Sequence, residues 1–257
     1  MGYLAGIALL GTGLKLKANY TNYSAILVSG AMAIFYFITY LAYSFYGLIP
    51  QSLAFAMMVL FTIFTVLAAL TYDRQVIAHI GLVGAYGVPF LLGDDSGNVT
   101  TLFTYMSIIN IGILLIAFRK NWKILQYVAF LLTWLIYFQW YESTYRQDEY
   151  FATAFTFLSI FFVIFYAISL GFQLFQKEKL ERLDLALLLL NAFIFYGLGY
   201  GLLNRHGNGQ ELLGLYTIGN AGIHFLVSAF LYQRKLVDRN LFYLVSGLVL
   251  VLSLIHI

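Results

Sequence analysis

Long apolar runs separated by short polar breaks extend along the whole chain. A helix needs about 20 such residues to cross about 30 Å of hydrocarbon, because it rises about 1.5 Å per residue. Apolar and polar positions do not alternate with a period of two, which disfavours membrane strands. The runs therefore predict ten membrane helices, at residues 2–14, 23–46, 51–72, 75–92, 100–118, 122–141, 151–173, 184–203, 211–233 and 241–257.

This pattern predicts an all-α, polytopic transmembrane bundle that forms a single integral membrane domain over residues 1–257. No Pro- or Ser-rich stretch separates soluble parts, and Pro50 and Pro89 are the only prolines. The first run is too short to span a bilayer, and the last runs apolar to Ile257. We therefore expect the first and last segments to be truncated and the chain to be a fragment of a longer multi-pass protein.

The positive charges concentrate on alternate connections. If each connection is numbered by the segment it follows, the odd connections hold 12 of the 14 Lys and Arg residues, and the even ones hold only Arg146 and Arg205. Cytoplasmic loops of membrane proteins are enriched in Lys and Arg. The charge distribution thus supports the segment assignment and predicts that the odd connections are cytoplasmic.

The composition excludes several other classes of protein. Hydrophobic residues make up 62% of the chain and charged residues 10%, whereas about a quarter of the residues of a soluble domain are charged. The lipid bilayer is therefore the expected partner, and nucleic acid is not. The lack of cysteine excludes disulfides and thiolate metal sites.

Two apolar stretches and a basic turn are distinctive. The stretches are Gly30-Ala-Met-Ala-Ile-Phe-Tyr36, continuing to Pro50, and Gly81-Leu-Val-Gly84-Ala-Tyr-Gly-Val-Pro89, and the turn is Arg119-Lys-Asn-Trp122. Together they resemble the bacterial predicted-membrane-protein family described as domain of unknown function 2339. The resemblance implies a bacterial inner (plasma) membrane location and many helices, with further helices on both sides in most members. It brings no established activity and no catalytic residue.

Uncharged polar residues occur inside the predicted helices, whereas charged residues occur only in connections or at helix ends. This placement disfavours proton pumps and voltage sensors, which use intramembrane charges. Polar residues recur every fourth position in the segment 211–233, so they share one helix face. With two asparagines from other segments, the predicted intramembrane polar lining comprises Asn110, Asn191, Tyr216, Asn220, His224 and Ser228. The lining has two interpretations, namely hydrogen bonding between helices or a polar path or substrate groove.

Acidic residues and a histidine mark the even connections. A candidate external cleft comprises Asp94, Asp95, Glu142, Asp148, His206 and Glu211. Asp94 and Asp95 have two interpretations, a solvated turn or a weak divalent-cation site. No phosphate-binding loop, zinc motif or nucleophile motif is present, so we assign no catalytic residue, cofactor or metal. A role other than catalysis is favoured.

Three functional classes remain open. The first is a multi-pass membrane protein that serves as a scaffold or assembly component of the cell envelope, with membrane helices from missing parts of the chain or from other subunits as partners. The second is a transporter or lipid-handling protein with an unknown small-molecule substrate. The third is a membrane transferase that acts on envelope sugars or lipids. A cavity at Asn220 and His224 would favour transport, and convergence of the external acids would favour an enzyme.

Overall fold

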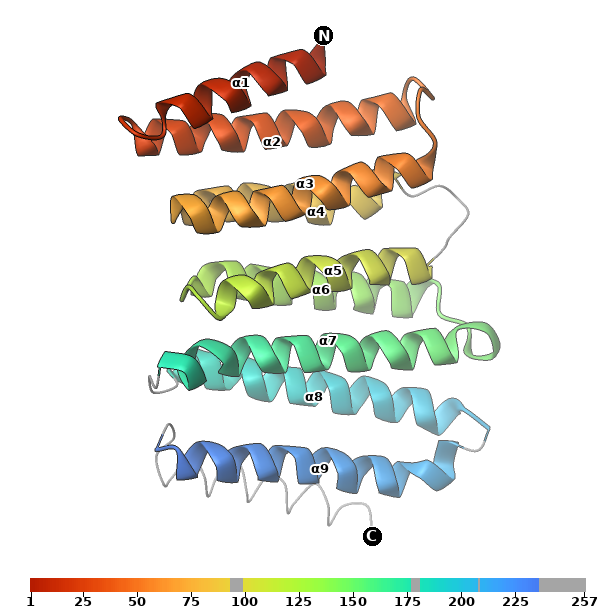
Figure 1. The fold of residues 1–257 in the computed structure, drawn as a ribbon. Coiled ribbons are helices and arrows are strands. Elements are labelled where there is room, and N and C mark those ends of the chain that lie inside the picture. Colours follow the sequence, from red (N-terminus) through yellow and green to blue (C-terminus); the bar gives the residue numbers. More distant parts are fainter. Residues whose placement is uncertain (93–98, 177–180, 208, 236–257) are drawn as a thin grey trace. The chain divides into compact units, whose positions relative to one another are not determined.

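The computed structural model describes residues 1–92, 99–176, 181–207 and 209–235. Within these ranges all regular structure is helical, which confirms the predicted all-α class. Figure 1 shows the nine helices of the described residues: α1 (Gly2–Leu16), α2 (Thr21–Ser44), α3 (Gln51–Tyr72), α4 (Gln75–Leu92), α5 (Val99–Ala117), α6 (Lys123–Ser143), α7 (Gln147–Gln176), α8 (Arg182–Arg205) and α9 (Gly209–Gln233).

Seven of these helices are long and apolar enough to cross a membrane, with mean hydropathy from 1.2 to 2.6 in their most apolar windows. The other two apolar helices, α1 and the Gln75–Gly87 part of α4, are shorter. The chain is therefore built as a multi-pass membrane protein. The tenth expected segment, 241–257, lies outside the described residues, so the count of ten stays a prediction, as does the truncation of both ends.

The observed helix ends follow local polar residues and differ from the expected ends by up to four positions. Helix α7 begins at Gln147 instead of residue 151, because Asp148 and Glu149 in its first turn interact favourably with the helix dipole. At the start of α8, the side chains of Glu181 and Asp184 form a capping box. An apolar run marks the part of a helix in hydrocarbon, whereas these polar residues determine where the helix ends.

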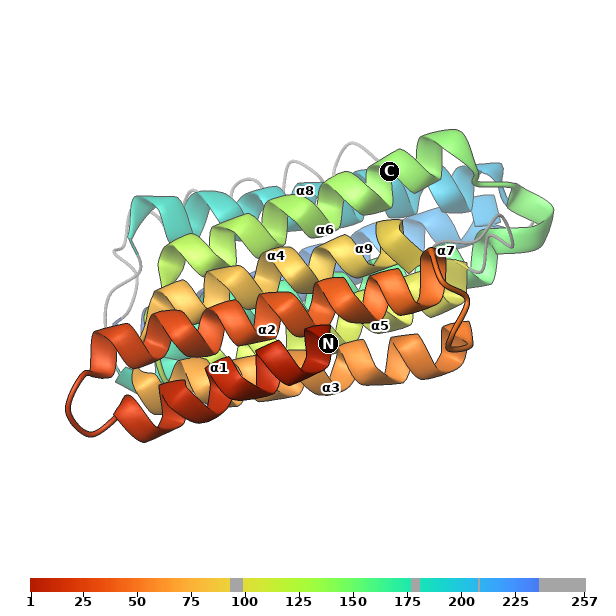
Figure 2. The same cartoon turned by 90° about the horizontal axis from the view of Figure 1, so that it is seen from above.

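The contacts between helices form two compact units, Met1–Leu135 and Ile136–Ile257, so each unit contains one part of α6. In the first unit, α2 contacts α1, α3 and α4, while α5 contacts α3 and α4 (Figure 1, Figure 2). In the second unit, α8 packs against both α7 and α9. The expected single membrane domain is not tested by this division and stays a prediction.

Aromatic rings and small residues fill the interior of each unit. In the first unit Phe35 stacks on Phe61 of the next helix, with 5.2 Å between ring centroids. Helices α3 and α4 approach closely at Gly81, where a Cβ atom would overlap the Thr65 side chain. In the second unit Phe162 of α7 stacks on Phe195 of α8 at 4.2 Å. These contacts set the distances between the helices that carry the polar residues.

Candidate functional site

The polar face predicted for the segment 211–233 belongs to α9 and comprises Tyr216, Asn220, His224 and Ser228; we call it the polar stripe. It lies on the side of α9 that packs against neighbouring helices of the second unit. Asn220 and Ser228 are buried, and Tyr216 and His224 are partly buried. The Tyr216 hydroxyl donates to the Phe195 carbonyl oxygen of α8 at 2.7 Å. One end of the stripe is therefore bonded to the backbone of α8.

His224 connects the stripe to α7. Its Nδ1 lies 2.9 Å from the Tyr166 hydroxyl, and its ring meets the Phe162 ring edge-on at 6.0 Å. The Asn191 Nδ2 of α8 donates to the Phe162 carbonyl oxygen at 3.0 Å. Phe162 thus contacts His224 through its ring and Asn191 through its backbone.

Asn191 and Asn220 lie at the same level on neighbouring helices. The short connection between α8 and α9 makes them antiparallel, and Tyr216 is bonded to Phe195. Asn191 precedes Phe195 by four residues, and Asn220 follows Tyr216 by four residues, so each is one helical turn from that bonded pair. The fold thus places five of the six predicted lining residues in the α7–α9 unit.

Three buried polar atoms at this level have no hydrogen-bond partner among the described residues: Asn191 Oδ1, Asn220 Oδ1 and His224 Nε2. Asn191 is 1% exposed and Asn220 is 6% exposed. Buried polar atoms are usually hydrogen-bonded, because leaving one unpaired costs about 1–3 kcal/mol. The interior of the α7–α9 unit therefore contains three polar atoms that lack the hydrogen bonds expected of buried groups.

Asn110, the sixth predicted residue, belongs to a hydrogen-bonded triad in the first unit. The Tyr86 hydroxyl of α4 donates to Asn110 Oδ1 at 2.6 Å, and Asn110 Nδ2 donates to Thr133 Oγ1 of α6 at 3.1 Å. The Tyr86 and Thr133 hydroxyl oxygens are 2.6 Å apart, which closes the ring. All three residues are buried. The Asn110 amide thus joins three helices.

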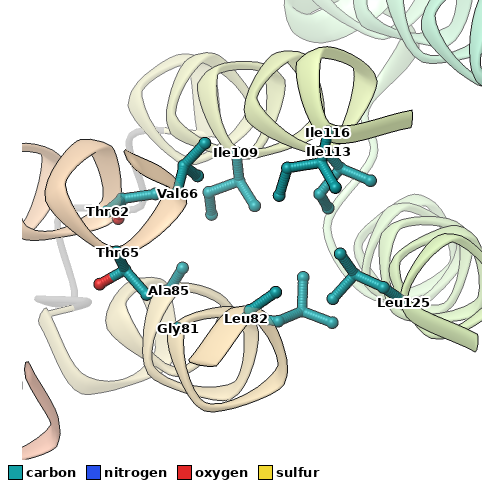
Figure 3. A pocket seen from close by; sticks show the side chains of 11 residues that line it. Thr62, Thr65, Val66, Gly81, Leu82, Ala85, Ile109, Ile113, Ile116 and Leu125 are labelled. Atoms are coloured by element: carbon teal, nitrogen blue, oxygen red, sulfur yellow. The ribbon is translucent and has the colours of Figure 1, made fainter. Parts of the chain in front are cut away.

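A small cavity of about 20 Å³ lies between α3, α4, α5 and α6 in the first unit (Figure 3). It has room for about one water molecule. Thr62 and Thr65 bring hydroxyl groups to its wall, but these groups donate to the carbonyl oxygens of Met58 and Phe61 in their own helix. The remaining lining is apolar, and none of the predicted lining residues contributes to it.

The candidate external cleft is only partly within the described residues. Asp94 and Asp95 lie outside them. Glu142, Asp148, His206 and Glu211 are exposed at the ends of helices in the second unit. The His206 ring stacks on Phe151, with 3.8 Å between centroids.

Within the part of the chain that the structure describes, no three His, Asp or Glu side chains are grouped closely enough to hold a metal ion. The cleft and its chemistry therefore stay a prediction.

Near Glu142 and Asp148, aromatic side chains cluster between α6 and α7. Trp140 meets the rings of Tyr145 and Tyr150 edge-on at 6.0 and 5.9 Å. Burial, and to a smaller extent the neighbouring Tyr141, raises the pKa of the Tyr145 hydroxyl, so this group remains protonated at neutral pH. These rings form a hydrophobic cluster and provide no ionised group for catalysis.

The comparisons with known proteins identify a family and no activity. The family model described as Predicted membrane protein (DUF2339) matches residues 1–255. No curated protein and no solved structure matches the chain. The match covers all the described helices of the multi-pass bundle. The chain therefore belongs to the DUF2339 family of predicted membrane proteins.

Proposed function

We propose that this chain is a scaffold or assembly component of the cell envelope, held in the bacterial inner membrane. The observation that supports this role best is the closed triad of Tyr86, Asn110 and Thr133, whose polar atoms bond to one another and present little to a substrate. Every charged residue within the described helices lies in a first or last turn. Such an interior is suited to holding helices in place.

We further propose that the odd connections face the cytoplasm. Lys17, after α1, lies over the ring of Tyr72 at the end of α3, and Asp73 forms an ion pair with Lys120, after α5. The first, third and fifth connections therefore meet at one end of the first unit, as alternate connections of a bundle should. This arrangement supports a common side for the Lys- and Arg-rich connections.

Helices from missing parts of the chain or from other subunits are the partners we propose for the scaffold. The lipid-accessible side chains of α9, including Leu215, Ile218 and Leu226, are strongly exposed in the described residues. They provide apolar area on which either lipid or another membrane helix can pack.

A transporter or lipid-handling protein is the second candidate, because a specific observation favours it. Asn191 Oδ1, Asn220 Oδ1 and His224 Nε2 are buried without partners among the described residues. A polar solute that passed between α7, α8 and α9 would provide those partners. In this role His224 would contact the solute, whereas in the scaffold it would only pack against Tyr166 and Phe162.

Substitution of His224 by Leu distinguishes these roles. In a strain that lacks the gene and has an envelope defect, the scaffold role predicts that His224→Leu restores the wild-type phenotype at a normal protein level. Ile223→Leu is the matched control, because Ile223 is the exposed neighbour on the same helix. A His224→Leu chain that accumulates normally and fails to restore the phenotype would contradict the scaffold role and favour transport.

A further inference from the structure

Basic residues from three connections gather at one end of the first unit. The Lys17 ammonium lies 4.6 Å from the centroid of the Tyr72 ring, and Lys120 Nζ lies 2.8 Å from Asp73 Oδ1. These contacts join the α1–α2, α3–α4 and α5–α6 connections, which lie together at the left of Figure 1. We call this region the basic end, and it comprises Lys15, Lys17, Asp73, Arg74, Arg119, Lys120 and Lys123.

The basic end carries mostly positive charge. The basic end contains six Lys and Arg residues and a single acid, Asp73, which is already paired with Lys120. Arg74 and Arg119 are exposed, and neither forms an ion pair with any described residue. The two guanidinium groups are therefore available to an external anion.

Buried contacts fix the helices that carry these cations. Tyr72 is buried, and its hydroxyl oxygen lies 2.8 Å from that of Ser24, which donates to the Gly13 carbonyl oxygen at 2.5 Å. The backbone of Asp73 is left-handed, with φ of 52°, and ends α3 immediately before Arg74. The positions of Lys17 and Arg74 thus follow from buried contacts.

Two other features of the basic end suit a phosphate at a membrane surface. Helices α2, α4 and α6 begin here, and none has an acidic residue in its first turn, so their positive dipole ends are not neutralised. Tyr20 and Tyr23 are exposed beside Lys17. Tyrosines of this kind are enriched where a membrane helix meets the lipid headgroups.

We propose that the basic end binds the headgroup phosphate of an anionic phospholipid of the phosphatidylglycerol class. The helices of the first unit have one terminus each at the basic end, so in a bilayer the cations lie at the depth of the headgroups. Arginine binds phosphate through two parallel hydrogen bonds, and Arg74 and Arg119 are the two arginines of the cluster. A zwitterionic lipid offers the same phosphate with a compensating cation and binds more weakly.

The test measures lipid binding to the purified full chain in detergent, by native mass spectrometry during titration with phosphatidylglycerol or phosphatidylcholine. The double variant Arg74→Gln/Arg119→Gln should lower the affinity for phosphatidylglycerol about 30-fold, which corresponds to about 2 kcal/mol for two cations at an anionic surface. Affinity for phosphatidylcholine should fall much less, because its choline cation offsets the charge of the phosphate. The control is Arg146→Gln/Arg205→Gln, which removes two arginines outside the basic end and should leave both affinities unchanged.

Equal loss of affinity in both double variants would overturn the proposal, because it would show a response to net charge alone. Displacement of phosphatidylglycerol by millimolar inorganic phosphate would also overturn it, since the site would then be a phosphate site and not a lipid site. Arg74→Lys/Arg119→Lys retains both charges and loses the paired hydrogen bonds, so its affinity for phosphatidylglycerol should lie between those of the wild type and the Gln variant. If the Gln variant fails to fold, an affinity of this Lys variant equal to that of the wild type would overturn the proposal.

Discussion

At the scale of single residues, the polar groups in the interior of this protein are neutral side chains, and several of them form hydrogen bonds between helices. Tyr86, Asn110 and Thr133 come from three helices of the first unit, and they hydrogen-bond to one another across the helix boundaries. Their hydrogen bonds therefore report directly on whether α4, α5 and α6 are correctly packed.

We expect Tyr86→Phe to destabilise the chain by about 1–2 kcal/mol. The substitution removes the hydroxyl from the 2.6 Å contacts with Asn110 and Thr133 and leaves both without one buried partner. The measurement is the midpoint of thermal unfolding in detergent, followed by circular dichroism, which should fall by a few degrees.

Tyr46→Phe is the matched control, because Tyr46 is 70% exposed in the connection between α2 and α3. It should leave the midpoint unchanged. Equal midpoints for Tyr86→Phe and Tyr46→Phe would show that the triad contributes no stability.

Only part of this triad could be identified from the sequence. Asn110 can be identified because an asparagine is conspicuous in an apolar run. Tyr86 and Thr133 do not stand out, because the chain has 21 tyrosines and hydroxyl-bearing residues occur at many helix positions. Whether one of them is buried beside an asparagine depends on the rotation and register of separate helices, which a linear pattern does not contain.

At the scale of helices, small residues determine how closely neighbours approach. Gly81 of α4 faces Thr65 of α3, and a Cβ atom at that position would overlap the Thr65 methyl group. Gly30 of α2 is also within a helix, but a Cβ atom there would have no atom within 4 Å. These two glycines separate the packing effect of a glycine from its effect on helix propensity.

Gly81→Ala should destabilise the chain by about 1–3 kcal/mol, because the added methyl group must push α3 and α4 apart. Gly30→Ala should be neutral or stabilising by up to about 1 kcal/mol, since alanine favours the helix and meets nothing. Unfolding by a denaturing detergent measures both changes. A Gly30→Ala chain as unstable as Gly81→Ala would contradict this account.

The helices themselves were largely predictable, since a membrane segment must be apolar over about 20 residues. The expected segment 51–72 agrees with α3, Gln51–Tyr72, at both ends. The apolar run predicts a shorter helix than α7, because the first turn of α7 is polar and lies outside the run. Helix neighbours were not predictable, since nearly every apolar face can pack equally well against lipid or protein.

At the scale of the whole molecule, the distribution of charge yields a test of membrane topology. Reporter fusions after residues 97 and 147 should be active outside the cytoplasm, and fusions after residues 121 and 179 should be active inside it. Alkaline phosphatase and a fluorescent protein are suitable reporters, because the first is active only outside and the second only inside.

The reverse pattern in all four fusions would overturn the proposed sidedness while leaving the helix assignment intact. A mixed pattern, with residues 121 and 147 on the same side, would contradict α6 as a spanning helix. Neither outcome would affect the lipid proposal, which depends on the cations being at a bilayer surface and not on which surface it is.

Because charges are confined to the first and last turns of the described helices, each long helix can enter a bilayer separately during synthesis. A charged residue at mid-membrane adds about 2.5–3.5 kcal/mol to insertion through the translocon, and these helices avoid that cost. The hydrogen bonds of Tyr86 can form only after α5 and α6 have also been inserted. We therefore expect the first unit to form in two stages, with insertion of the helices first and their lateral assembly second.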